Sequence, residues 1–194
     1  STQVLSSAAS DVYKRQSLMK YPEKVAKCIE SLKNNCSLPV TIKHRIGIDE
    51  DDSFRNLNYF VRHIANAGAD RFTVHARKAI LKGLSPKQNR TIPPLKYDVV
   101  KKLKKLNPNL LIEINGGFAS IDDSLEALND FDGVMIGRSA YKHPLRWSDI
   151  DEKIYGVHEK PKSASNIIFS LIPYIDEHIT NGGKSWDICK HLIN

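Results

Sequence analysis

The stretch Leu110–Gly117, LLIEINGG, decides the fold together with the later stretch Gly133–Arg138, GVMIGR. Each is a short apolar run of the length typical of a fully buried strand, and each ends in glycine beside a polar residue. Between them, Ser120–Asn129 predicts an amphipathic helix with a capping box in its first turn. A strand, a helix and a strand at this spacing predict two parallel neighbours joined by a right-handed crossover.

The ends of these two strands predict an anion site. We expect Asn115-Gly116-Gly117 and Gly137-Arg138 to emerge side by side, because the carboxyl ends of parallel strands lie at one edge of the sheet. Glycine lets the backbone approach a ligand closely, and the N–H groups of a following helix start favour an anion. In a (β/α)₈ barrel, the loops after the last two strands often bind phosphate. The alternative is two tight turns without a ligand.

The residues before Leu110 predict two more strands that alternate with helices. The predicted helices are Pro22–Asn35, Ser53–Ala67 and Tyr97–Leu106, and the predicted strands are Leu38–Lys43 and Arg71–Val74. Lys43 and His75 then lie at carboxyl ends of strands, at the same edge as the glycine turns. An acidic run, Asp49–Asp52, precedes the second helix, and we expect it only to complement the helix dipole.

A long polar connection, Ala79–Pro94, follows the second of these strands. It is far longer than the usual strand-to-helix loop of about 2–6 residues, and long loops at this face of a barrel usually carry function. It contains Lys82, Lys87 and Arg90 and no acidic residue. A basic loop suits a polyanionic substrate, and the alternative is a loop made basic for solubility.

The composition describes one globular domain outside the membrane. The chain has 194 residues, 41% hydrophobic and 26% charged, and no apolar run approaches the length of a membrane span. Its 29 Lys and Arg against 22 Asp and Glu permit a nucleic-acid partner without requiring one. Cys28, Cys36 and Cys189 are odd in number and lack metal-ligand spacing, so we expect no disulfide framework, no metal and a reducing cytoplasm. We expect Cys28 to be a small core residue.

The two ends of the chain differ from its middle. Residues 1–16 show no periodicity, and we interpret them as an extraneous or disordered leader. After Arg138 the alternation stops: Tyr141–Trp147 is predicted as a link and 160–163 as a linker. Helices are predicted over Asp149–Ile154, over Asn166–Ile179 with a kink or a break at Pro173, and from Ser185 to the end.

Four strands, each delivering polar residues to one edge, predict part of a barrel. A closed (β/α)₈ barrel needs eight strands, and an open doubly wound sheet would carry G-x-G-x-x-G after its first strand, which is absent. We therefore predict an α/β chain comprising the C-terminal half of a TIM barrel, about strands 5–8, followed by a truncated α-helical domain. The predicted boundaries are 1–16 for the leader, 17–150 for the partial barrel and 151–194 for the helical part.

Four segments carry a resemblance to a known family. TIKHRIGIDEDDS, FTVHARKAILKGLSPKQNRTIPPLKYD, IEINGG and DGVMIGRSAYKHP resemble the tRNA-dihydrouridine synthases, specifically the DusA type, and the similarity extends from Ser17 to Asn194. The resemblance implies an FMN-binding TIM barrel followed by a helical tRNA-binding domain. Such an oxidoreductase reduces a uridine on the D-loop side of tRNA to 5,6-dihydrouridine, and NADPH reloads the flavin. We expect the intact enzyme to be monomeric.

The resemblance also assigns roles to individual residues. Lys43 and His75 match flavin contacts, because a cation near the flavin ring stabilises its reduced anionic form. The residues that match the FMN phosphate site are Asn115, Gly116, Gly117, Gly137 and Arg138. Basic positions that contact tRNA in the family are matched by Lys87 and Arg90, and we expect Arg77 and Lys78 to contribute to the same contact. Taken alone, Lys43 and His75 could equally be solvated residues at the rim of the sheet.

One departure from the family concerns the catalytic acid. The family's proton-donating cysteine belongs to a loop upstream of the first helix, and no cysteine of this chain matches it. We therefore expect no catalytic residue in this chain and no activity from the chain alone. Two other functions stay open: another FMN-dependent TIM-barrel oxidoreductase, such as a dihydroorotate-dehydrogenase-like enzyme acting on a small molecule, and a non-catalytic RNA-binding remnant.

Overall fold

The computed structural model describes residues 17–157, 163–190 and 192. They form two compact units: the first contains the residues up to Phe118 together with Glu126–Met135, and the second contains Ala119–Leu125 and the residues from Ile136 onward. The predicted leader and residues 160–162 of the predicted linker lie outside the described residues.

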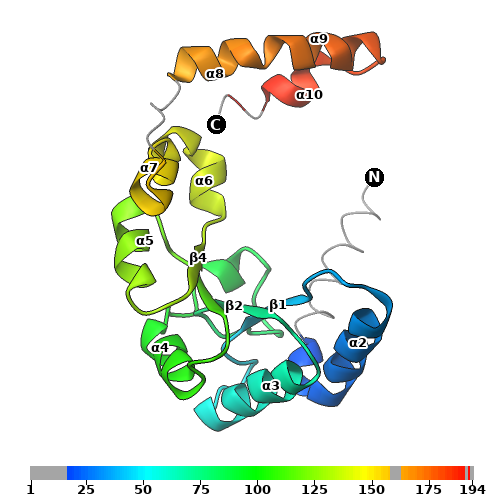
Figure 1. Ribbon diagram of the computed structural model, residues 1–194, viewed down its shortest axis with the longest axis vertical. Coiled ribbons are helices and arrows are strands. Elements are labelled where there is room, and N and C mark those ends of the chain that lie inside the picture. Colours follow the sequence, from blue (N-terminus) through cyan, green and yellow to red (C-terminus); the bar gives the residue numbers. More distant parts are fainter. Residues whose placement is uncertain (1–16, 158–162, 191, 193–194) are drawn as a thin grey trace. The chain divides into compact units, whose positions relative to one another are not determined.

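A parallel four-stranded sheet forms the centre of the first unit (Figure 1). Its strands are β1 (Thr41–Arg45), β2 (Arg71–His75), β3 (Ile112–Asn115) and β4 (Gly133–Met135), in that spatial order. Parallel strands in sequence order with helices between them are consistent with part of a TIM barrel, and all four predicted strands are confirmed.

The predicted bounds of β1 are wrong at both ends. The strand begins at Thr41 rather than Leu38, because Pro39 has no N–H to donate and the N–H of Val40 donates to the Asp70 carboxylate at 2.6 Å instead of to a neighbouring strand. It continues to Arg45, so Lys43 lies inside the strand.

The strand register separates the side chains into two faces. Two rows of paired residues cross one face: Lys43, Thr73 and Glu113 form the first row, and Arg45, His75 and Asn115 form the second. Because side chains alternate along a strand, the residues between these rows point to the opposite face, which is apolar and carries Phe72, Val74, Ile112 and Ile114. The sheet therefore has one polar and one apolar face.

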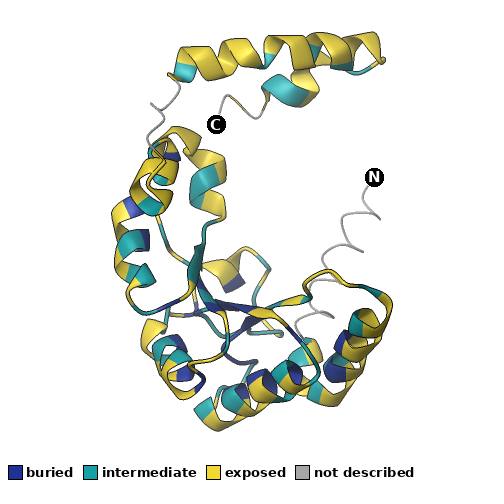
Figure 2. Cartoon of the chain, in the orientation of Figure 1, coloured by how far each residue is buried: buried dark blue, intermediate teal, exposed yellow. Residues whose placement is uncertain are grey.

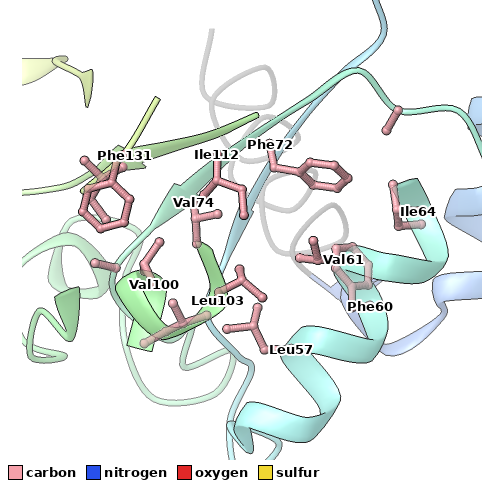
Figure 3. Packing of buried hydrophobic residues seen from close by; sticks show 14 of the residues in the cluster. Leu57, Phe60, Val61, Ile64, Phe72, Val74, Val100, Leu103, Ile112 and Phe131 are labelled. Atoms are coloured by element: carbon pink, nitrogen blue, oxygen red, sulfur yellow. The ribbon is translucent and has the colours of Figure 1, made fainter. Parts of the chain in front are cut away.

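Three helices cover the apolar face: α2 (Pro22–Asn35), α3 (Phe54–Asn66) and α4 (Tyr97–Leu106). Figure 3 shows the labelled side chains of α3 and α4 packed around those of β2 and β3: Leu57, Phe60, Val61, Ile64, Val100 and Leu103 around Phe72, Val74 and Ile112. Complete burial of such a side chain stabilises the fold by roughly 1.5–3 kcal/mol.

The helix bounds agree with the predicted ones for physical reasons. Ser53 caps α3, because its hydroxyl accepts the N–H of Asn56 at 3.2 Å, and Gly68 follows its end with a φ of 101°. Ser120 likewise caps α5 (Ile121–Leu128) by accepting the N–H of Asp123 at 3.1 Å.

Two predictions of burial are wrong. Cys28 is exposed, because α2 lies beside α3 at the β1 end of the layer and buries only Ala26 and Ile29. Strand β4 is half-buried along its whole length rather than fully buried, because it is the last strand of the described sheet.

Besides the first part of α5, the second unit consists of short helices. These are α6 (Arg138–Lys142), α7 (Ile150–Tyr155), α8 (Ala164–Ser170), α9 (Ile172–Thr180), α10 (Ser185–Cys189) and the 3₁₀ helix η3 (Pro144–Trp147). The predicted link before Ser148 is thus helical, and the predicted break at Pro173 is confirmed because α9 begins anew one residue before it. Most side chains of α8 and α9 are exposed (Figure 2). None of the described helices is long and apolar enough to cross a membrane.

Candidate functional site

The polar face of the sheet gathers three of the predicted site residues at its carboxyl edge. Lys43 Nζ donates a hydrogen bond of 3.1 Å to Asn115 Oδ1, and Asn115 Nδ2 donates one of 2.7 Å to the main-chain oxygen of Met135. This chain of hydrogen bonds links β1, β3 and β4. His75 lies in the same row as Asn115, on β2, which is between β1 and β3.

The row of Lys43, Thr73 and Glu113 explains why Lys43 donates to a neutral amide rather than to a carboxylate. Glu113 belongs to the same row as Lys43, but its carboxylate already accepts from the Thr73 hydroxyl at 2.7 Å and pairs with Arg71 at 3.0 Å. Among the described residues, no carboxylate lies within ion-pair distance of Lys43. Desolvation and the positive charge of Arg45 lower the pKa of Lys43. An ammonium in this setting favours an anionic or electron-rich ligand.

The turn after β3 packs closely against the side chain of His75. A Cβ atom at Gly116 would lie 2.6 Å from Cδ2 of His75 and 2.9 Å from Cδ2 of Leu95, and the φ of Gly116 is 115°. The Tyr97 hydroxyl donates to the Gly116 carbonyl. Packing and backbone conformation therefore both require glycine here, whether or not a ligand binds, so the double glycine alone does not identify a phosphate site.

Gly137 and Arg138 belong to the second unit, where Arg138 is the first residue of α6. A Cβ atom at Gly137 would meet nothing within 4 Å. That these two residues share a phosphate site with Asn115, Gly116 and Gly117 stays a prediction.

The long connection after β2 runs from residue 76 to residue 96, and we name it the basic loop. The 3₁₀ helix η2 (Gln88–Arg90) is its regular part. Lys82, Lys87 and Arg90 are exposed along it. The loop therefore presents positive charge to solvent, as predicted.

Arg77 and Lys78, also predicted to bind tRNA, are half-buried in the loop's own structure. Arg77 Nη1 donates to the main-chain oxygens of Thr91, at 3.3 Å, and Pro93. Lys78 Nζ lies 3.3 Å from the carboxylate of Asp52 and donates to the main-chain oxygen of Asp49. Their contact with RNA stays a prediction, and the structure gives both a role in holding the loop.

The acidic run before α3 has a role that the sequence did not reveal. Asp49 pairs with Lys20 at 3.3 Å and accepts the N–H of Leu81 at 2.7 Å, and Asp52 pairs with Lys78. That the run also complements the dipole of α3 stays a prediction. The run therefore joins the β1–α3 connection to the basic loop.

The part of the chain that the structure describes contains neither a cluster of metal-ligating side chains nor a disulfide. There, no group of three or more His, Cys, Asp or Glu side chains is arranged to hold a metal ion. The three cysteines are free thiols, and none of them belongs to a strand of the sheet.

Comparison with known proteins identifies relatives along nearly the whole chain. The family model described as "Dihydrouridine synthase (Dus)" matches residues 16–194. The chain is similar to the "tRNA-dihydrouridine(20/20a) synthase" of Synechocystis sp., with 47% identity over 177 residues, 91% of this chain and 53% of that protein. The proteins of the same name from Pseudomonas putida and Vibrio cholerae are 44% and 40% identical, again over 91% of this chain and 52% and 54% of their own lengths. The chain thus spans about half the length of the curated relatives it matches.

Proposed function

The chain belongs to the dihydrouridine synthase family, and from that premise we propose that the complete protein reduces a D-loop-side uridine of tRNA to 5,6-dihydrouridine. The names of the relatives specify 20 and 20a, and we propose that these tRNA positions are the substrate here. We further propose FMN as the cofactor and NADPH as the reductant. When bound, FMN would supply the hydride chemistry that couples NADPH oxidation to reduction of the uracil ring.

We propose that the sheet is the second half of a (β/α)₈ barrel, about strands 5–8, and that the helical part from residue 151 begins a tRNA-binding domain. A closed barrel needs eight strands, and four are described. A sheet with helices on its apolar face and charged residues on the other fits a barrel wall whose polar face lines the active site. By "complete enzyme" we mean this chain joined to the first half of that barrel.

The hydrogen-bonded chain from Lys43 through Asn115 to Met135 is the observation that carries the proposal. It holds an ammonium group, without a carboxylate partner among the described residues, at the carboxyl edge where barrel enzymes bind their ligands. Such a cation fits the electron-rich edge of a reduced flavin, so the residues present suit the cofactor.

Each residue of this edge has a distinct task in the proposal. Lys43 would hold the flavin ring and stabilise the charge it gains on reduction. Asn115 would orient Lys43, since both polar atoms of its amide are engaged in the sheet. His75 would lie against the ring, and Gly116 makes room for its imidazole. Gly117, Gly137 and Arg138 are proposed as phosphate contacts, and Asn115 and Gly116 as members of that site, on the sequence motif alone.

The basic loop supports tRNA as the substrate rather than a small molecule. Lys87 and Arg90 are exposed on it, and we propose that they contact RNA phosphates. We propose that the acid that protonates the uracil ring comes from the first half of the barrel, because no cysteine of this chain matches the family's proton-donating cysteine.

The test is flavin content and NADPH oxidation by the complete enzyme, with and without unmodified tRNA. Wild-type enzyme should retain FMN, and tRNA should be required for sustained NADPH oxidation. Lys43→Ala should slow flavin reduction, whereas Lys105→Ala, which removes an exposed lysine from α4, should not. Turnover driven by a small pyrimidine and indifferent to tRNA would overturn the proposal in favour of another FMN enzyme.

A further inference from the structure

The basic loop is unusually well anchored for a connection of its length. A loop that is disordered in the free protein loses conformational entropy when a ligand orders it, and this loss weakens binding. Here three independent sets of contacts fix the loop before any ligand binds. Two of the sets hold Asn89, which lies between Lys87 and Arg90, and the third holds the start of the loop.

The first set belongs to Asn89, whose side chain is buried although its neighbours are exposed. Only 1% of Asn89 is exposed, whereas Gln88 and Arg90 on either side are exposed. Its Oδ1 accepts the N–H of Ile80 at 2.8 Å, and its Nδ2 donates to the main-chain oxygens of Ile80 at 2.7 Å and Leu84 at 3.4 Å. The amide thus bonds both main-chain groups of Ile80, as a neighbouring strand would.

The second set belongs to Arg45 at the end of β1. Its Nη1 atom donates to the main-chain oxygens of Asn89, at 2.9 Å, and Lys78, at 3.1 Å. Burial, with Arg77 and Arg90 nearby, lowers the pKa of Arg45 to about 10, so the guanidinium stays charged at neutral pH. A buried charged donor to two carbonyl groups ties the start of the loop, at Lys78, and its middle, at Asn89, to the sheet.

The third set joins the loop to the β1–α3 connection. Ala79 exchanges main-chain hydrogen bonds with its neighbours there: its N–H donates to the Gly47 carbonyl at 2.9 Å, and its carbonyl accepts the N–H of Asp49 at 2.7 Å. The Asp49 carboxylate also accepts the N–H of Leu81 at 2.7 Å. Gly47 permits the tight turn of the β1–α3 connection that presents these groups, because a Cβ atom there would lie 2.6 Å from Cα of Asp52.

We propose that Asn89 is a positioning residue for RNA binding, which fixes Lys87 and Arg90 as a preformed pair of phosphate contacts. Asn89 does not touch RNA. It acts through its neighbours: Lys87 is two residues before it and Arg90 is the next residue, and all three are held by the turn that the buried amide closes. This inference rests on the proposed function, since it assumes that Lys87 and Arg90 meet tRNA.

The central experiment measures tRNA affinity against salt concentration for the complete enzyme and its Asn89→Ala variant. If Lys87 and Arg90 each neutralise a phosphate, Lys87→Ala/Arg90→Ala should lower the slope of log K against log salt by about 1.4–1.8, at about 0.7–0.9 for each contact. Asn89→Ala should lower the slope in the same direction and weaken binding about tenfold at low salt. FMN content and tRNA-independent NADPH oxidation should not change.

Asn107→Ala is the matched control for loss of a buried asparagine amide. Asn107 is 9% exposed, and its Nδ2 donates to Asn58 Oδ1 at 2.8 Å and to the Leu103 main-chain oxygen at 2.9 Å, away from the basic loop. Its variant should lose thermal stability but keep the salt slope of wild type. An equal slope change in both variants would indicate general destabilisation and overturn the inference.

A thermodynamic cycle separates positioning from any other role. Asn89→Ala added to Lys87→Ala/Arg90→Ala should weaken tRNA binding no further, because Asn89 acts only through those two side chains. Trypsin should also cleave after Lys82, Lys87 and Arg90 faster in Asn89→Ala than in wild type. A further loss of affinity in the triple variant, or unchanged cleavage in Asn89→Ala, would refute the positioning role.

A second variant serves if Asn89→Ala does not fold. Asp49→Gly removes the acceptor of the Leu81 N–H and tolerates the φ of 50° at this position, so it should loosen the loop and lower the salt slope in the same way. If Lys87→Ala/Arg90→Ala leaves the slope unchanged, the proposed tRNA contact fails, and the inference fails with it. If that variant lowers the slope but Asn89→Ala and Asp49→Gly do not, only the inference fails.

Discussion

Replacing Gly116 by alanine should displace His75 from the candidate site and destabilise the fold. The new Cβ atom would lie 2.6 Å from His75 Cδ2, 2.9 Å from its Nε2 and 2.9 Å from Leu95 Cδ2. Overpacking of this kind costs about 1–3 kcal/mol. The φ of 115° is also unfavourable for alanine and adds about 1–3 kcal/mol. The free energy of unfolding should therefore fall by about 2–6 kcal/mol.

Gly83→Ala separates the two contributions. Gly83 also has a positive φ, 90°, but a Cβ atom there would meet nothing within 4 Å. The control should show the backbone cost alone, about 1–3 kcal/mol, when both variants of the complete enzyme are unfolded in urea. Gly116→Ala should also reduce FMN content, since His75 is proposed to lie against the flavin, whereas Gly83→Ala should not. Equal destabilisation of the two variants would refute the packing of His75 on Gly116.

Three further predictions concern the cofactor, pH and the isolated chain. In the complete enzyme, Arg138→Ala should weaken FMN retention about tenfold to a hundredfold, because a charge-assisted bond to phosphate is worth roughly 1.5–3 kcal/mol. Lys43→Ala should mainly slow reduction of the flavin by NADPH. Equal FMN loss in the two variants, with normal reduction rates, would contradict these separate roles. Burial of His44 against Phe60 and Phe72 lowers its pKa from 6.5 to about 4, so the folded state binds the proton more weakly than the unfolded state. The free energy of unfolding should be unaffected by this group above about pH 6.5 and should fall by roughly 3 kcal/mol as the pH drops towards 4. The fall should be smaller in His44→Leu. An identical pH dependence in that variant would be evidence against the buried imidazole. This chain alone should reduce no uridine and should self-associate through its strand edges, and a monomer with a cooperative thermal transition in sedimentation and calorimetry would contradict the second expectation.

The sequence predicted the parts of the fold that depend on local chemistry. Apolar periodicity placed α2 and α4 at their observed bounds, and the hydroxyl of Ser53 and the flexibility of Gly68 marked the ends of α3. The start of β1 was missed because Val40 uses its N–H for the Asp70 carboxylate, a contact between residues 30 positions apart. Such a contact leaves no local pattern.

In the candidate site, too, the sequence predicted what depends on local pattern and missed what depends on contacts between distant residues. The strand ends predicted that Lys43 and Asn115 would share one edge, and their hydrogen bond confirms that they meet. Nothing in the sequence distinguished Asn89 from the other polar residues of the basic loop, because its burial results from contacts with Ile80 and Leu84 that only the folded loop creates. The role of Asp49 was hidden for the same reason, since its partner Leu81 lies on a different connection.

The most direct test of the central claim is the dihydrouridine content of an unmodified tRNA after incubation with the complete enzyme, FMN and NADPH, measured by mass spectrometry of its nucleosides. We expect reduction of one or more uridines at positions 20 and 20a, with product formation greatly slowed by Lys43→Ala and unaffected by Lys105→Ala. An enzyme that retains flavin and oxidises NADPH but leaves every uridine of the tRNA unreduced would contradict it.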